Sequence, residues 1–120
     1  MTRINVGIPP AELTGKHLIA EHREIKRIPN CIRKGKYNME GIPDKFKLGS
    51  GHVKFFYNKL KYLKYRYIML YTECLRRGYN VQNYIGAWDG VPDDLMGSYS
   101  PTQEDAKIVR QRINEKLNNE

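Results

Sequence analysis

The sequence predicts an all-α protein that forms one compact single domain, with three main helices joined by long ordered loops. The chain has 120 residues, which is enough for one hydrophobic core. Residues 53–77 contain no glycine or proline and carry apolar side chains at alternating four- and three-residue steps, the period of an amphipathic helix. No region is rich in strand signals, and no internal repeat or low-complexity tract is present.

The first helix is expected from about residue 14 to about residue 28. Thr14 can cap its N-terminus, because a threonine hydroxyl accepts a hydrogen bond from a backbone N–H of the first turn. Pro29 is expected to kink or interrupt the helix, which can resume to about residue 34. The helical period places Leu18, Glu21, His22 and Ile25 on one side and Ala20, Arg23, Glu24 and Arg27 on another. A glycine-rich loop is expected over residues 35–51.

The second helix is expected over residues 53–77. Its apolar stripe consists of Phe56, Leu60, Leu63, Tyr67, Leu70 and Cys74. We expect this stripe to face the core rather than to line a cofactor site. Gly78 follows two arginines, which is typical of a helix end, because glycine readily adopts the left-handed conformation there and cations interact favourably with the last carbonyls.

The third helix is expected to start after Pro101. Thr102 and Asp105 can form a capping box, in which each side chain accepts a hydrogen bond from the backbone N–H of the other residue. The intervening segment, residues 80–100, is rich in glycine, aspartate, asparagine and tyrosine. We expect it to be an ordered loop held by Tyr84 and Trp88.

The charge of the chain favours a nucleic-acid partner. There are 21 Lys and Arg against 13 Asp and Glu, which gives a formal net charge of +8 and a pI near 9.5. Charge of this sign and size attracts polyanions, and the cations recur from Arg3 to Lys116, as a folded binding face requires. A basic composition without functional meaning is the competing interpretation.

Tyrosines and cations are interleaved along the second helix. Such a pattern suits a nucleic-acid surface, through stacking on bases and contact with phosphates, but tyrosines also close the edge of a small core. For Tyr67 and Tyr71 we expect the core position, and for Tyr62 and Tyr65 both interpretations stay open. The interleaved cations are Lys54, Lys59, Lys61, Lys64 and Arg66.

Several classes of protein are disfavoured. The sequence has no apolar run that could span a membrane and no secretory signal, so we expect a cytoplasmic protein. Cys31 and Cys74 are the only cysteines and are expected to be reduced core residues. His17, Glu21 and His22 are close in sequence but form neither an HExxH nor a CxxC pattern, so we expect no metal and no cofactor.

The start of the chain carries a candidate nucleophile. Threonine is small, so a bacterial-type aminopeptidase is expected to remove Met1 and to leave a primary amine on Thr2. The ordinary pKa of such an amine is about 7.7–8.0, so part of it is unprotonated near neutral pH. With the carboxylate of Glu24, it makes a minimal set for Schiff-base chemistry on a DNA sugar. Taken alone, Glu24 is better interpreted as an ordinary salt-bridged helix residue.

Five blocks of the sequence match one known family in order and approximate spacing. They are Met1-Thr-Arg-Ile-Asn5, His17-Leu-Ile-Ala-Glu-His-Arg-Glu24 with Arg27, Gly49-Ser-Gly-His-Val-Lys-Phe-Phe-Tyr57, Glu73-Cys-Leu-Arg-Arg-Gly-Tyr-Asn80 and Arg112-Ile-Asn-Glu-Lys116. On these residues the chain resembles the phage-type pyrimidine-dimer DNA glycosylase/AP lyases, the endonuclease V family of T-even phages. The resemblance implies a compact helical enzyme that cuts DNA at lesions without a metal.

The resemblance also implies roles for individual residues. The nucleophile is the α-amino group of Thr2, and the essential carboxylate is Glu24, which neighbouring arginines keep ionised. The residues implied in DNA binding are Arg3, Lys16, His17, Arg23, Arg27, Arg112 and Lys116. Lys16 stands where the family has glutamine, so this contact departs from the family pattern. The implied reaction expels the damaged base, forms an imine and breaks the strand by β-elimination.

Members of this family continue into an aromatic C-terminal tail that contributes to recognition of the pyrimidine dimer in DNA, whereas this chain stops at Glu120. We therefore expect residues 1–120 to form a single glycosylase/AP-lyase-like domain without that tail. It is expected to act as a monomer on double-stranded DNA that contains a lesion or an abasic site, in the cytoplasm of a phage-infected or bacterial cell. Two alternatives stay open: an inactive basic nucleic-acid-binding module, and a glycosidase acting on a different modified base or nucleotide.

Overall fold

Helices are the only regular elements in the described part of the chain. The computed structural model describes residues 2–118, and no strand occurs among them. The elements are η1 (Pro10–Glu12), α1 (Gly15–Glu24), α2 (Arg27–Arg33), α3 (His52–Phe55), α4 (Leu60–Arg76), η2 (Ile85–Trp88), η3 (Asp93–Leu95) and α5 (Gln103–Asn118), where η denotes a 3₁₀ helix. The predicted all-α class is confirmed.

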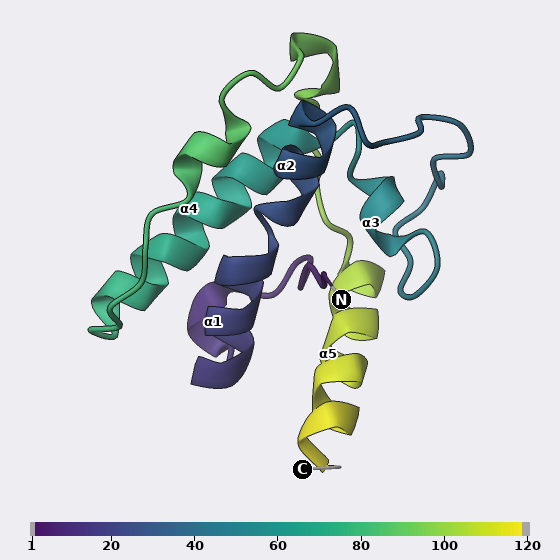
Figure 1. Ribbon diagram of the computed structural model, residues 1–120. Coiled ribbons are helices and arrows are strands. Elements are labelled where there is room, and N and C mark those ends of the chain that lie inside the picture. The colour runs from purple at the N-terminus through teal and green to yellow at the C-terminus, as the bar shows by residue number, and fades with distance from the viewer. Residues whose placement is uncertain (1, 119–120) are drawn as a thin grey trace.

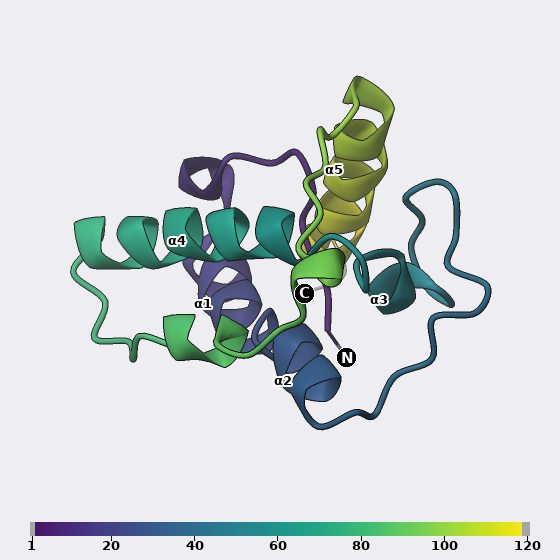
Figure 2. The ribbon, with the colours of Figure 1, turned by 90° about the horizontal axis from the view of Figure 1, so that it is seen from above.

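The longest helix, α4, organises the fold. α1 packs against α4, and η2 contacts both α2 and α4. Figure 1 shows the N-terminal segment entering between α1 and α5. Figure 2 shows α4 lying across α1, with α5 beyond the end at which α4 begins. One hydrophobic cluster joins these elements and includes Ile4, Leu18, Ile28, Leu63 and Trp88, each at most 4% exposed.

Short-range sequence signals locate several helix ends correctly. The hydroxyl of Thr14 accepts a hydrogen bond from the His17 N–H at 3.3 Å, so it caps α1 as predicted. Thr102 and Asp105 form the predicted capping box of α5, with both reciprocal bonds at 3.0 Å. Gly78 follows α4 with a φ of 80°, the left-handed conformation expected after a helix end.

The first predicted helix breaks earlier than its proline suggests. α1 ends at Glu24 and α2 starts at Arg27, so the break lies at residues 25–26. A proline ring clashes with the carbonyl four residues before it, which for Pro29 is the carbonyl of Ile25. Pro29 itself fits within the first turn of α2, because the N–H groups there need no intrahelical partner.

The second predicted helix is also divided, and this corrects the single helix expected over residues 53–77. α3 ends at Phe55 and α4 starts at Leu60. A loop from elsewhere in the chain packs into the break: Gly97 lies so close to Asn58 that a Cβ on the glycine would be 2.3 Å from the Asn58 carbonyl oxygen. The same glycine accepts a hydrogen bond from the Tyr62 N–H at 3.2 Å. A straight helix would remove this contact.

The tyrosines and cations that the sequence places on α4 differ in their exposure to solvent. Tyr67 is 1% exposed and lies in the core, as predicted, whereas Tyr65 is 58% exposed. Tyr62 and Tyr71 are half-buried. Arg66 was grouped above with the cations of a nucleic-acid surface, and this is wrong because the residue is only 3% exposed.

The loop between α4 and α5 is ordered in the way the sequence indicates. The indole N–H of Trp88 donates to the Leu60 carbonyl at 3.1 Å, and the Tyr84 N–H donates to the Tyr67 hydroxyl at 2.5 Å. Both cysteines are free thiols. Cys74 is fully buried, whereas Cys31 is half-buried and its thiol donates to a backbone carbonyl.

Candidate active site

The N-terminal arm, residues 2–8, runs through the interior instead of fraying. Ile4, Val6 and Ile8 are each at most 1% exposed, although chain termini are usually poorly ordered unless they are tied down. The Ile4 N–H donates to the ring nitrogen Nε2 of His52 at 2.9 Å. Asn5 is 5% exposed and is held through both atoms of its carboxamide. The arm therefore has a fixed register against the rest of the fold.

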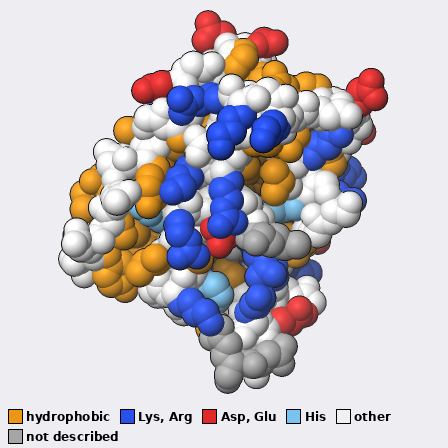
Figure 3. All heavy atoms as spheres, viewed as in Figure 1, with side chains coloured by type: hydrophobic (Ala, Val, Ile, Leu, Met, Phe, Trp, Pro, Cys, Tyr) orange, Lys and Arg blue, Asp and Glu red, His pale blue; other side chains and the backbone are white. Residues whose placement is uncertain are grey.

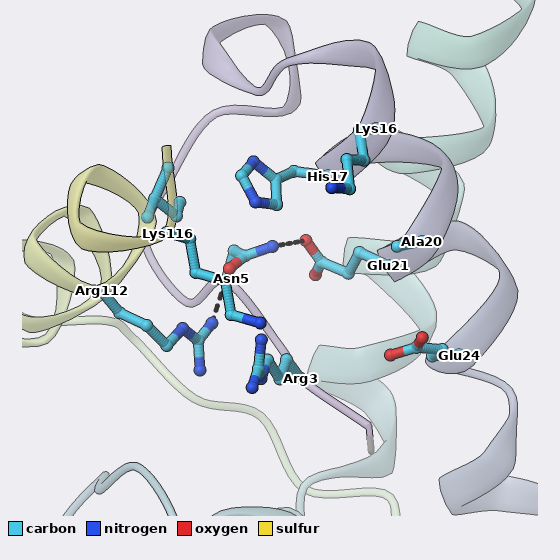
Figure 4. A pocket seen from close by; sticks show the side chains of 10 residues that line it. Arg3, Asn5, Lys16, His17, Ala20, Glu21, Glu24, Arg112 and Lys116 are labelled. Atoms are coloured by element: carbon cyan, nitrogen blue, oxygen red, sulfur yellow. Dashed lines mark hydrogen bonds between the residues drawn. The ribbon is translucent and has the colours of Figure 1, made fainter. Parts of the chain in front are cut away.

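A pocket of about 330 Å³ opens between this arm, α1 and α5. Figure 4 shows the side chains of all three elements converging on it. Four of the side chains around it are those of lysine or arginine, and two are carboxylates. The lining residues are Arg3, Asn5, Lys16, His17, Ala20, Glu21, Glu24, Arg112, Ile113 and Lys116. Residues that are more than 80 positions apart in the sequence therefore share one site.

The two carboxylates of the pocket have different surroundings. Glu21 is 2% exposed and receives two hydrogen bonds from the guanidinium of Arg66, at 2.8 and 2.9 Å. The side chain of Glu24 is 16% exposed and lies 3.5 Å from the guanidinium of Arg23, which is itself mostly exposed. Glu21 thus serves a structural ion pair, and Glu24 is the carboxylate that faces the space of the pocket.

A chain of buried and partly buried hydrogen bonds fixes one cation of the pocket, Arg112. The Asn5 amide nitrogen donates to Glu21 at 2.8 Å, and the Asn5 amide oxygen accepts from the Arg112 guanidinium at 2.7 Å. Arg66 completes the chain by donating both to Glu21 and to the Ile8 carbonyl. Because the Asn5 carboxamide is held by Glu21 at one end and bonds Arg112 at the other, the ion pair of Glu21 and Arg66 also fixes the position of Arg112.

Arg112 is a half-buried cation that lies near a second cation, Arg3. Burial lowers the pKa of its guanidinium, and the neighbouring positive charge of Arg3 acts in the same direction, while Glu21 opposes them. A guanidinium in this position gains from the arrival of an anion, because the anion replaces lost hydration and separates two like charges. The pair of arginines therefore favours a phosphate or carboxylate ligand.

Thr2 lies beside this pocket, in the wall of a second hollow. The hollow has a volume of about 710 Å³ and shares Arg3 and Arg112 with the pocket that contains Glu24. Thr2 is 9% exposed. The expected removal of Met1 concerns a residue outside the described part of the chain.

The surface around both hollows is basic. Figure 3 shows a band of Lys and Arg side chains that runs down the face seen in Figure 1, over α2, the arm and α5, with an acidic side chain in its middle. Arg23 and Arg27 are both exposed, on α1 and α2. They lie outside the lining of the pocket.

The residues expected from the sequence are therefore largely brought together. Arg3, Lys16, His17, Glu24, Arg112 and Lys116 line the same pocket. The sequence reasoning missed the residues that support them, which are Asn5, Glu21, His52 and Arg66. One signal was present: the helical period placed Glu21 and His22 on the apolar side of the first helix, and polar residues on such a side need buried partners.

Two further findings concern the described residues alone. Residues 2–118 contain no group of three or more His, Cys, Asp or Glu side chains that could hold a metal ion. Within the same residues, no helix is both long and apolar enough to cross a membrane.

A pocket rich in arginine and lysine, with one half-buried carboxylate facing its open space, defines a site for a polyanionic substrate on a basic helical protein. A model of the family described as pyrimidine dimer DNA glycosylase matches residues 1–85, and the chain belongs to this family. The predicted resemblance is thereby confirmed, and the protein is a DNA-repair glycosylase whose substrate is DNA. The match ends before α5, so the place of Arg112 and Lys116 in the site rests on the geometry of the pocket.

Proposed function

We propose that the protein is a DNA glycosylase with AP lyase activity, in which the α-amino group of Thr2 is the nucleophile and Glu24 is the essential carboxylate. The observation that supports this proposal is the junction of the two hollows. Thr2 lines one, Glu24 lines the other, and Arg3 and Arg112 line both. A deoxyribose at this junction has an amine on one side, a carboxylate on the other and cations for its phosphates.

In the first step the amine attacks the anomeric carbon of the damaged nucleotide. The bond from this carbon to the base breaks, and the base leaves with the electron pair and takes up the proton that the amine loses after its attack. Positive charge develops on the sugar, and the Glu24 carboxylate stabilises it electrostatically. The cations around the arm disfavour a further positive charge, so they favour the unprotonated, nucleophilic form of the amine.

In the second step the sugar ring opens and an imine joins the amine to the anomeric carbon. Glu24 takes a proton from the adjacent sugar carbon, C2′. The electron pair released moves toward the imine, and the bond from C3′ to its phosphate oxygen breaks by β-elimination. Water then hydrolyses the imine and frees the enzyme. Arg3 and Arg112 hold the flanking phosphates during both steps.

Borohydride trapping tests the nucleophile directly. Reduction of the imine formed with duplex DNA that contains one abasic site should give a stable adduct, and peptide mapping by mass spectrometry should place the DNA on the α-nitrogen of Thr2. An adduct on a lysine side chain would reassign the nucleophile. If no adduct forms at any pH between about 7 and about 9 (about one unit to either side of the ordinary amine pKa), the protein is a binding module of the kind left open above.

Glu24→Gln tests the carboxylate. The variant should bind abasic DNA nearly as well as the wild type and should lose strand cleavage, because the amide neither stabilises positive charge nor accepts the proton. Glu115→Gln is the matched control, since Glu115 is an exposed carboxylate of α5 outside the pocket. A Glu24→Gln protein that cleaves at the wild-type rate would remove Glu24 from the mechanism. A panel of thymine dimers, oxidised bases, modified cytosines and abasic sites then identifies the preferred lesion.

A further inference from the structure

We propose that His52 is a positioning residue of the lyase reaction: its neutral ring clamps the nucleophile-bearing arm, and protonation of the ring releases the arm. This inference rests on the proposed function of Thr2. It starts from the place of His52 between two segments that both border the second hollow. One is the arm, which carries Thr2, and the other is the loop that ends at α3.

The hydrogen bonds of His52 fix its protonation state. Nε2 lies 2.9 Å from the Ile4 nitrogen, which can only donate, so Nε2 must be unprotonated. Nδ1 lies 2.8 Å from the Lys47 carbonyl oxygen, which can only accept, so Nδ1 must carry the hydrogen. Only the neutral Nδ1–H tautomer satisfies both partners. In a doubly protonated ring, the Nε2–H and the Ile4 N–H would be two donors facing each other, and the hydrogen bond would be lost.

The ring has no freedom to escape this conflict. His52 is 3% exposed, and the rings of Phe46 and Phe56 meet it edge-on, with centroids at 5.4 and 5.5 Å. Thr2 is only two residues before Ile4, so its nitrogen lies at most about 7 Å along the chain from the nitrogen that His52 holds. A displacement of the backbone at Ile4 therefore also displaces the α-amino group of Thr2.

The charged groups that face His52 favour the neutral ring. Burial is the largest influence and lowers the pKa of His52, and the positive charges of Arg112 on α5 and Arg3 on the arm lower it further. The hydrogen bond to the Lys47 carbonyl and the charge of Glu21 on α1 act in the opposite direction. Glu21 is already paired with Arg66. The clamp is therefore engaged at neutral pH and opens in acid.

Two substitutions separate the clamp from the packing. His52→Phe keeps an aromatic ring between Phe46 and Phe56 but has no acceptor for the Ile4 N–H. His52→Gln keeps an acceptor oxygen at a similar reach and does not titrate. His22→Gln is the matched control, because His22 is also a buried histidine at 2% exposure but contacts Tyr67 rather than the arm.

The experiment measures the single-turnover rate of borohydride trapping on abasic duplex DNA, with binding to an unreactive tetrahydrofuran analogue as the second readout. His52→Phe should trap DNA about 10- to 100-fold more slowly, because misplacing a reacting group by about 1 Å lowers the reaction rate by up to about that factor. Its affinity for the analogue should change little. His52→Gln should trap at nearly the wild-type rate at neutral pH. His22→Gln should leave the trapping rate unchanged at temperatures where the protein is folded.

The pH profile provides the signature of the clamp. Protonation of the amine alone gives a limiting slope of about one in the logarithm of the rate against pH, and a second required neutral group raises it to about two. In acid, the slope for the wild type should rise from about one to about two while circular dichroism shows that the protein is still folded. The slope for His52→Gln should stay at about one. A wild-type profile that keeps the single slope while folded would overturn the proposal.

The remaining outcomes are also decisive. If the wild type traps DNA and His52→Phe traps it equally fast, His52 positions nothing. If His22→Gln slows trapping as much as His52→Phe does, the effect is general destabilisation and the proposal fails. If the wild type does not trap at all, the proposed function fails instead, and the clamp is then judged by amide hydrogen exchange. Faster exchange at Ile4 in His52→Phe supports the clamp, and unchanged exchange overturns it.

Discussion

Replacing Arg66 with methionine should strongly destabilise the fold, because it strands a buried carboxylate. The side chains of Arg66 and Glu21 are 2% and 1% exposed, and they share two hydrogen bonds at 2.8 and 2.9 Å. Arg66 also donates to the Ile8 carbonyl of the arm. Within residues 2–118, the hydrogen bond that the Glu21 carboxylate keeps in Arg66→Met is the one from Asn5.

The size of the effect follows from the nature of the pair. Removing one partner of a buried ion pair costs about 3–5 kcal/mol, mainly because the remaining charge has lost its solvent and gained nothing in return. At about 4 °C per kcal/mol for a domain of this size, the melting temperature should fall by about 12–20 °C. Urea unfolding followed by circular dichroism measures the free energy, and a thermal scan measures the midpoint.

A surface pair gives the control. Arg110 and Glu12 form two hydrogen bonds of similar length, at 2.8 and 3.0 Å, but their side chains are 48% and 47% exposed. Arg110→Met should therefore destabilise the fold much less than Arg66→Met does, because solvent screens an exposed ion pair. Equal losses in Arg66→Met and Arg110→Met would refute the argument from burial. A Glu21→Leu change added to Arg66→Met should recover part of the loss, since it removes the stranded charge.

Three further results are expected. Arg112→Ala should weaken binding to abasic duplex DNA and reduce the slope of log affinity against log salt by about one for each lost phosphate contact, whereas Arg110→Ala should leave the slope unchanged. Burial lowers the pKa values of His22 and His52, so the unfolded chain binds more protons in acid than the folded protein does. The free energy of unfolding should be highest above about pH 7 and should fall as the pH drops through about 6.5, by at most about 1.4 kcal/mol per pH unit per histidine. Urea titrations at several pH values should show a smaller fall in His22→Gln. Thr102→Ala should cost about 1 kcal/mol in the same unfolding assay through loss of the α5 cap, and an unchanged midpoint would show that the cap contributes nothing.

The sequence predicted what depends on neighbouring residues. The caps at Thr14 and Thr102 and the end at Gly78 each involve partners within five positions along the chain. The break between α3 and α4 was missed because its cause is distant. Gly97 is almost 40 positions from Asn58, and no local pattern indicates that its loop packs against the break.

The same distinction applies to the site. The family motif indicated which residues of the arm, α1 and α5 matter, and the fold brings six of them around one pocket. Their supporting residues could not be paired from the sequence. Arg66 was grouped with surface cations because its neighbours on α4 are basic, and only the fold reveals that it faces Glu21, 45 positions away. Burial of a charged residue depends on its partner, and the partner is set by tertiary structure.

In the mechanism proposed above, the interior course of the arm gives the α-amine of Thr2 an advantage over a lysine side chain. A lysine amine is carried on four flexible bonds, whose freedom must be lost when it attacks. The α-amine of Thr2 would instead be attached to an arm that is already ordered, with Ile4 held by His52 and Asn5 held between Glu21 and Arg112. Much of the ordering needed for attack is then provided by folding rather than by substrate binding. It follows that substitutions at the buried supports His52 and Glu21 should slow the reaction more than they weaken DNA binding, whereas substitutions at the exposed Arg23 and Arg27 should do the reverse.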